Sequence, residues 1–366
     1  MVPLQKKFNA LYREMFKPNC GYLDQITCPP CWRYTDYDAR TPDAGKFSAA
    51  YRVMVESLRA EEADFGPVLS EGKTQIYFAG LCDSYAQPQR MYMDVIPDFN
   101  LRKLHTMNND CGFELGWINY KGAKGGKPQK WSYKLLAYEH IYGNIAHIFG
   151  NYHGAPLNPL PDYFIRSYFL IQPAQKYYAL TPIKDIFYNV NGKPGTLEEA
   201  IAADTLSCNQ LKIVYENGLA VAANLNDKEN FEVTLHGKKY ILPPEGFAAY
   251  LPGKVETYSA LNKAGKRSDL MKEGNLIYIA GNPDIAEISA QYDYTLRKKG
   301  ETLELTPAPF KKAETVTLQV PFTGRAKVVS LDRKGKTLAQ SSIAVKDGKL
   351  QLPIDGKAFR YLVSRK

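Results

Sequence analysis

Two short apolar runs, each ending in an acidic residue, constrain the fold of this chain more than any other feature. Residues 21–23 run into Asp24, and residues 68–70 run into Glu71. One segment with helical periodicity separates the two runs, so the order reads strand, loop, helix, strand. In a β/α barrel this order brings the C-terminal ends of successive strands to one face. The sequence therefore predicts that Asp24 and Glu71 lie together at the C-terminal face of such a barrel.

Apolar residues at three- and four-residue spacing predict the helices of this half. Residues 1–19 form one such segment, and residues 163–178 form a later one that we expect to cover the lower part of the barrel. Between the two acidic residues, Thr41 and Pro42 supply a capping residue and a proline suited to a first helical turn. We expect the central helix to begin there and to end near Asp64.

From about residue 180 the pattern changes to short apolar runs separated by Asn-Gly and His-Gly turns. Such runs occupy residues 211–215, 219–224, 231–235, 315–320, 326–331, 349–352 and 360–364. Short strands at regular spacing, with turn residues between them, are typical of β-sandwiches. We expect two packed β modules that divide near residue 283.

The chain is too short for a complete barrel followed by these β modules. A full β/α barrel takes roughly 250 residues, whereas about 178 precede the β region. The predicted fold class is α/β plus all-β: the C-terminal portion of a (β/α)8 barrel at residues 1–178, a β-sandwich-like domain at 179–282 and a small β-sandwich at 283–366. The chain would then begin at the helix before the fourth barrel strand, as a fragment or as one half of a split protein. The alternative is a compact α/β fold that only imitates a barrel.

Composition narrows the expected partners. The net charge of +9 would suit a polyanion, but the clustered lysines lie at apparent turns of the C-terminal half, where they protect sheet edges from pairing. We therefore expect no nucleic-acid partner. No apolar run is long enough to cross a membrane, so we expect no membrane partner either. The chain shows no signal peptide, and its compartment stays open because any export signal would lie upstream.

Cysteine and histidine spacing predicts neither a metal nor a cofactor. Cys28 and Cys31 have the spacing of a redox pair, but no thioredoxin-like βαβ context surrounds them, and the two prolines between them remove backbone donors. A thiol oxidoreductase is therefore disfavoured. No histidine pair accompanies the cysteines at zinc spacing.

Three segments carry a resemblance to a known group of enzymes: residues 21–27 (GYLDQIT), 33–40 (RYTDYDAR) and 66–72 (GPVLSEG). They resemble bacterial barrel glycosidases related to the endo-α-N-acetylgalactosaminidases of glycoside hydrolase families 101 and 129. The resemblance covers most of residues 1–280, but the first three barrel strands have no counterpart here. It implies secreted or periplasmic full-length relatives. It also implies a partner that completes the fold, either a missing N-terminal barrel half or a second copy of the chain.

Carried over position by position, the resemblance makes Asp24 the nucleophile and Glu71 the general acid/base of a retaining glycosidase that acts on an α-linked glycan. One carboxylate attacks the anomeric carbon while the second, kept protonated, protonates the leaving oxygen. Retention requires carboxyl groups about 5–5.5 Å apart, and inversion requires a larger gap. Two alternatives stay open. In the first, Asp24 and Glu71 only cap loops or pair with arginines. In the second, the chain binds carbohydrate as a scaffold and does not hydrolyse it.

The segment after the first acidic residue supplies most of the candidate residues for binding a carbohydrate substrate. These candidates are Trp32, Tyr34, Asp36, Asp38, Arg40 and, at another expected strand end, His105. Trp32 and Tyr34 suit stacking on a sugar ring, and Asp36 or Asp38 suits bidentate binding of vicinal hydroxyls. The competing interpretation is that Asp38 and Arg40 hold one another in a surface loop, as exposed ion pairs commonly do.

Overall fold

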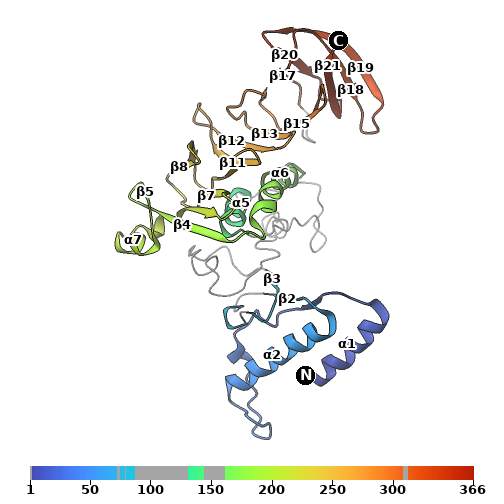
Figure 1. The fold of residues 1–366 in the computed structure, drawn as a ribbon. Coiled ribbons are helices and arrows are strands. Elements are labelled where there is room, and N and C mark those ends of the chain that lie inside the picture. The colour runs from blue at the N-terminus through green and yellow to red at the C-terminus, as the bar shows by residue number, and fades with distance from the viewer. Residues whose placement is uncertain (1, 72–74, 79, 87–130, 144–160, 308–311) are drawn as a thin grey trace. The chain divides into compact units, whose positions relative to one another are not determined.

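The computed structural model describes residues 2–71, 75–78, 80–86, 131–143, 161–307 and 312–366 (Figure 1). The described residues form two compact units, one made of residues up to 86 and one made of residues from 131 onward. Each unit has its own cluster of buried apolar side chains.

The first unit is a small α/β layer built on three parallel strands. Its elements are α1 (Val2–Phe16), β1 (Gly21–Leu23), the 3-10 helix η1 (Cys31–Tyr34), α2 (Phe47–Phe65), β2 (Val68–Glu71), the 3-10 helix η2 (Gln75–Phe78) and β3 (Ser84–Ala86). The strands pair in the order β1-β2-β3, and both pairings are parallel. The predicted strand–helix–strand order is confirmed here, because α2 is the helix that connects β1 to β2.

One face of this sheet packs against α2. Val68 of β2 is fully buried in a cluster with Met54 and Leu58 of α2 and Phe78 of η2. Met54 and Leu58 are four residues apart, which places them on one side of the helix. Tyr22 alternates to the other face of β1 and is exposed. The helix α2 therefore covers one face of the three-stranded sheet.

The helix α2 begins later than the sequence predicted. Thr41 and Pro42 were expected to start it, but the helix starts at Phe47. Between these positions Asp43 and Gly45 adopt left-handed φ values of 62° and 80°, which a right-handed helix cannot contain. The expected boundary was therefore wrong, since the capping signal belongs to a turn and not to the helix.

The second unit is dominated by antiparallel strands. Its helices are α5 (Trp131–Tyr142), α6 (Pro161–Tyr178), α7 (Leu197–Ala202) and the 3-10 helix η3 (Leu206–Cys208). Its strands are β4 (Ile183–Val190), β5 (Lys193–Gly195), β6 (Gln210–Tyr215), β7 (Ala220–Asn224), β8 (Phe231–Leu235), β9 (Lys238–Leu242), β10 (Phe247–Leu251), β11 (Val255–Leu261), β12 (Arg267–Glu273), β13 (Leu276–Ala280), β14 (Ile288–Ser289), β15 (Tyr294–Lys299), β16 (Thr302–Pro307), β17 (Glu314–Gln319), β18 (Gly324–Leu331), β19 (Thr337–Lys346), β20 (Lys349–Ile354) and β21 (Arg360–Arg365). Sixteen of these strands form a single sheet, in the order β14-β17-β20-β19-β18-β21-β16-β15-β13-β12-β11-β10-β7-β6-β4-β5, and β8 pairs with β9.

The expected fold class, a partial (β/α)8 barrel followed by β-sandwich domains, is wrong. The described residues are mostly β, and one antiparallel sheet replaces the two expected sandwiches. This sheet crosses the expected boundary near residue 283, where β13 pairs with β15. One hydrophobic cluster draws residues from both sides of that boundary, including Leu270 and Leu305. The five α-helices of the described residues do not form the outer ring of a barrel.

The helix expected to cover the lower barrel packs on the antiparallel sheet instead. Phe169 of α6 stacks on Tyr278 of β13 with ring centroids 5.0 Å apart. The Thr257 hydroxyl of β11 donates to the Leu170 carbonyl at 2.8 Å. Helical periodicity identifies a buried face but not the sheet that buries it, so the helix was predicted correctly and its packing was not. Within the described residues, no helix combines the length and apolar character needed to span a membrane.

Candidate functional site

Asp24 and Glu71 lie at the ends of neighbouring strands. β1 and β2 are parallel and in register up to the pair of Leu23 with Ser70, so Asp24 and Glu71 are the next residue on each path. Adjacent strands lie about 4.8 Å apart. Asp24 is exposed and Glu71 is half-buried. Neither carboxylate has a hydrogen-bond or ion-pair partner among the residues that the structure describes.

Hydrogen bonds hold the turn after β1 against the end of β2. The Ser70 hydroxyl donates to the Leu23 carbonyl at 2.7 Å, and the Thr27 hydroxyl donates to the Glu71 carbonyl at 2.7 Å. Ser70 and Thr27 are fully buried, and Ile26 packs against the core of this unit. The backbone positions of the two acidic residues are therefore coupled by buried contacts.

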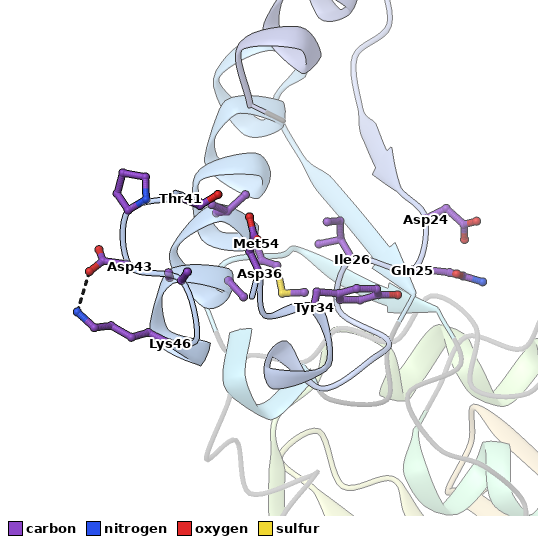
Figure 2. A pocket seen from close by; sticks show the side chains of 14 residues that line it. Asp24, Gln25, Ile26, Tyr34, Asp36, Thr41, Asp43, Lys46 and Met54 are labelled. Carbon is purple, nitrogen blue, oxygen red and sulfur yellow. Dashed lines mark hydrogen bonds and ion pairs between the residues drawn. The ribbon is translucent and has the colours of Figure 1, made fainter. Parts of the chain in front are cut away.

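A pocket of about 650 Å³ lies between the loop that follows β1 and the first half of α2 (Figure 2). Its lining residues are Asp24, Gln25, Ile26, Tyr34, Asp36, Thr41, Pro42, Asp43, Ala44, Lys46, Ala49, Ala50, Val53 and Met54. Figure 2 shows Tyr34 and Asp36 near the middle of the pocket, with Asp24 at one end and directed outward. The pocket thus brings together three of the predicted site residues, Asp24, Tyr34 and Asp36.

The far end of the pocket carries an ion pair that the sequence analysis missed. Lys46 Nζ lies 2.8 Å from Asp43 Oδ1, and Figure 2 shows this pair at the end opposite Asp24. The hydrogen bond from Lys46 lowers the pKa of Asp43. The opposite charges at three-residue spacing were the available signal, but they suggested no pocket because the helix was expected to begin at Thr41.

Trp32 lies outside the pocket lining, in an aromatic pair. Its ring meets that of Tyr77 edge-to-face, with centroids 5.6 Å apart and an interplanar angle of 85°. Trp32 is 50% exposed and Tyr77 is 46% exposed. The Tyr51 hydroxyl of α2 donates to the Tyr77 carbonyl at 2.9 Å, which holds η2 against the helix. The sequence analysis did not select Tyr77, because nothing local shows that it meets Trp32.

Asp38 and Arg40 form a surface pair outside the pocket lining. Arg40 Nε lies 2.9 Å from Asp38 Oδ1, and the Nη2 atom lies 2.6 Å from Oδ2. The hydrogen bond from the Arg40 side chain lowers the pKa of Asp38. Both residues are exposed, which is the geometry of the surface-loop interpretation.

Glu71 and His105 are the other two predicted site residues. Glu71 is not among the residues that line the pocket, although its strand ends beside Asp24. His105 lies outside the described residues.

The structure gives no site for a metal in the part of the chain that it describes. No group of three or more histidine, cysteine or acidic side chains there has the geometry to hold a metal ion. Cys31 is buried in the core of the first unit, and Cys28 is half-buried; both are free thiols.

Comparison with known proteins gives no family for this chain. No protein-family model matches the sequence, and no curated protein matches it. The geometry of the site therefore carries the functional argument.

Proposed function

We propose that the chain is a retaining glycoside hydrolase acting on an α-linked glycan, with Asp24 as nucleophile and Glu71 as general acid/base. The observation that carries this proposal is the in-register parallel pairing of β1 with β2, whose last pair, Leu23 with Ser70, comes directly before Asp24 and Glu71. Neighbouring strand backbones lie about 4.8 Å apart, so the separation of about 5–5.5 Å between carboxyl groups that retaining enzymes need is within reach of these two side chains. The proposal depends on these two strand ends only. The resemblance to endo-α-N-acetylgalactosaminidase-type enzymes supports the same two roles.

The reaction would take two steps with a covalent intermediate. In the first, a carboxylate oxygen of Asp24 attacks the anomeric carbon as the glycosidic bond breaks, and the protonated Glu71 gives its proton to the leaving oxygen. In the second, Glu71 removes a proton from water, and that water attacks the anomeric carbon. The bond to Asp24 then breaks and its carboxylate is restored. The two inversions leave the anomeric configuration unchanged.

The pocket beside Asp24 suits part of a glycan. Tyr34 offers an aromatic face, and Asp36 offers a carboxylate that already accepts a hydrogen bond from the Asp38 backbone amide at 2.8 Å. Its second oxygen remains available to a sugar hydroxyl, since a carboxylate accepts several hydrogen bonds. Concave sites with a few polar groups among apolar walls are typical of small-molecule binding. We therefore assign Tyr34 and Asp36 to substrate binding in this proposal.

A second function, carbohydrate binding without hydrolysis, is favoured by the exposed aromatic pair of Trp32 and Tyr77. Each ring is about half exposed, and neither lines the pocket beside Asp24. Exposed aromatic faces can receive a sugar ring by stacking. The two functions predict different results for the same variants, because only hydrolysis requires the acidic residues.

Hydrolysis of a panel of aryl α-glycosides tests the proposal. Asp24→Asn should lower kcat/KM by about a thousandfold or more. Glu71→Gln should do the same for glycosides with poor leaving groups, and should lose less with an activated aryl group that departs without a proton. On that activated substrate Glu71→Gln should accumulate a glycosyl adduct on Asp24, detected by intact mass spectrometry, because the water is no longer deprotonated.

The control variant is Glu62→Gln, which removes an exposed acidic residue of α2 in the same unit. It should leave hydrolysis unchanged. Full activity in either Asp24→Asn or Glu71→Gln would contradict the assigned roles. Glycan binding that persists in both variants, with no hydrolysis by the unsubstituted chain, would select the binding function, and Trp32→Ala should then abolish that binding.

A further inference from the structure

The helix α1 contacts α2 through polar side chains and leaves a stripe of large apolar side chains exposed. Six large apolar side chains of α1 are 48–70% exposed. They define the α1 stripe: Leu4, Phe8, Leu11, Tyr12, Met15 and Phe16. At about 100° per residue they fall within one arc of about 140° around the helix. In the usual arrangement the apolar stripe of a helix faces the core and is buried.

Polar contacts with α2 hold α1 in this orientation. The Asn9 amide donates to Glu61 Oε2 at 3.0 Å and to Asp64 Oδ2 at 2.9 Å. Gln5 donates to the Ser57 carbonyl and to Glu61, each at 3.0 Å. Asn9 and Glu61 are buried. Rotating α1 to bury the stripe against α2 would leave these buried groups without partners, at a cost of about 1–3 kcal/mol each.

The exposed area matches the needs of a dimer. At roughly 200 Å² for each large side chain, the six residues leave about 700 Å² of apolar surface open. The largest apolar patch of an ordinary monomer is about 300–600 Å², and a stable protein–protein interface takes about 800 Å² from each partner. The α1 stripe offers a large part of that area, and Leu4, Phe8, Leu11 and Met15 by themselves expose about 450 Å² of it.

The spacing within the stripe is that of a helix–helix seam. Leu4, Phe8, Leu11 and Met15 follow a 4-3-4 spacing, which corresponds to the a and d positions of two heptads. Two such helices related by a two-fold axis and running antiparallel would place Leu4 against Met15 of the other copy, and Phe8 against Leu11. The seam is therefore complementary to itself.

Charges beside the seam favour the antiparallel arrangement. Lys7 and Glu14 occupy equivalent positions on the flank of the seam that lies away from α2. Both are exposed, and neither has an ion-pair partner among the described residues. In the antiparallel arrangement Lys7 of each copy lies near Glu14 of the other, so two opposite-charge pairs form. A parallel arrangement would not bring these two residues together.

We propose that the α1 stripe is a homodimer interface in which the α1 helices of two copies pack antiparallel. Each α1 would then contact its own α2 through Gln5 and Asn9, and the second copy through Leu4, Phe8, Leu11 and Met15. The inference does not depend on the proposed function, because it uses no residue of the candidate site.

The test is the oligomeric state of the full chain by sedimentation velocity, from about 1 to 100 µM, a range that covers ordinary dimer affinities. We expect a dimer. Leu11→Glu should raise the dimer Kd by at least about a hundredfold, because it places a charge at the centre of the seam. Leu180→Glu is the matched control, since Leu180 is 91% exposed and lies outside the stripe. It should leave the Kd unchanged.

Charge exchange tests the orientation. Lys7→Glu and Glu14→Lys should each raise the Kd about tenfold, and the double variant should restore it, because the pairs re-form with reversed sign. Circular dichroism checks that each variant stays folded. A monomer throughout the concentration range, or a dimer indifferent to Leu11→Glu, overturns the interface. A double variant that does not recover overturns the antiparallel arrangement.

Discussion

Replacing His140 with glutamine should remove about 3 kcal/mol of the loss of stability that the second unit undergoes between pH 7 and pH 4. His140 lies in α5 with no exposed surface, stacked on Phe247 with ring centroids 4.3 Å apart. Its Nδ1 atom donates to the Leu136 carbonyl at 2.7 Å. Burial lowers the pKa of His140 to about 4, and the hydrogen bond with Leu136 only partly opposes this shift.

The sign of the effect follows from proton binding. In the unfolded chain a histidine has a pKa of about 6.5, so between about pH 6.5 and 4 the unfolded state binds the proton and the folded state does not. The free energy of unfolding therefore falls as the pH falls through this range. A difference of about 2.5 pH units corresponds to about 3 kcal/mol lost between pH 7 and pH 4.

Urea unfolding of the unsubstituted chain and of His140→Gln, followed by far-UV circular dichroism at a series of pH values, measures this loss. The difference in free energy between the two proteins should change by about 3 kcal/mol from pH 7 to pH 4. Gln keeps a donor for the Leu136 carbonyl but does not titrate. The control His236→Gln changes a surface histidine of the same unit. A pH dependence that is the same with and without His140 would refute the reasoning.

Two further predictions concern buried polar contacts. Ser70→Ala removes the donor to the Leu23 carbonyl and should destabilise the first unit by about 1–3 kcal/mol in urea unfolding. Under the proposed function it should also lower kcat more than it raises KM. A variant with the same free energy of unfolding and the same kcat as the unsubstituted chain would contradict a positioning role for Ser70. Arg166→Met leaves the buried Asp269 without the guanidinium that lies 3.2 Å away, and should destabilise the second unit by about 3–5 kcal/mol. Adding Asp269→Asn to Arg166→Met should recover part of that loss, and the absence of any recovery would show that the ion pair is not what holds α6 to the sheet.

Local patterns in the sequence were enough to find many elements. The apolar positions Met54 and Leu58 predicted a helix, and α2 buries both. β20 alternates exposed and buried residues along its length, as its sequence predicted for a strand. These features were predictable because they depend on residues only two to four positions apart.

The candidate site was predictable only in part. A strand–helix–strand order makes neighbouring strands parallel, so Asp24 and Glu71 could be placed at adjacent strand ends from sequence alone. The pairing of Trp32 with Tyr77, and the ion pair of Asp43 with Lys46 at the pocket end, could not. They depend on side-chain positions that the loop conformation sets.

The sequence by itself determined the type of many local elements, such as α2 and β20, because apolar periodicity acts within a single segment. Only the tertiary structure decided which segments pack together. The hydroxyl of Thr257 meets the carbonyl of Leu170 across 87 positions of chain, so α6 lies on an antiparallel sheet and not on a barrel. An apolar face can pack against any surface of complementary shape, so it does not specify its partner. Buried polar groups such as Asn9 and Glu61 do specify it, because each needs a hydrogen-bond partner at a defined position.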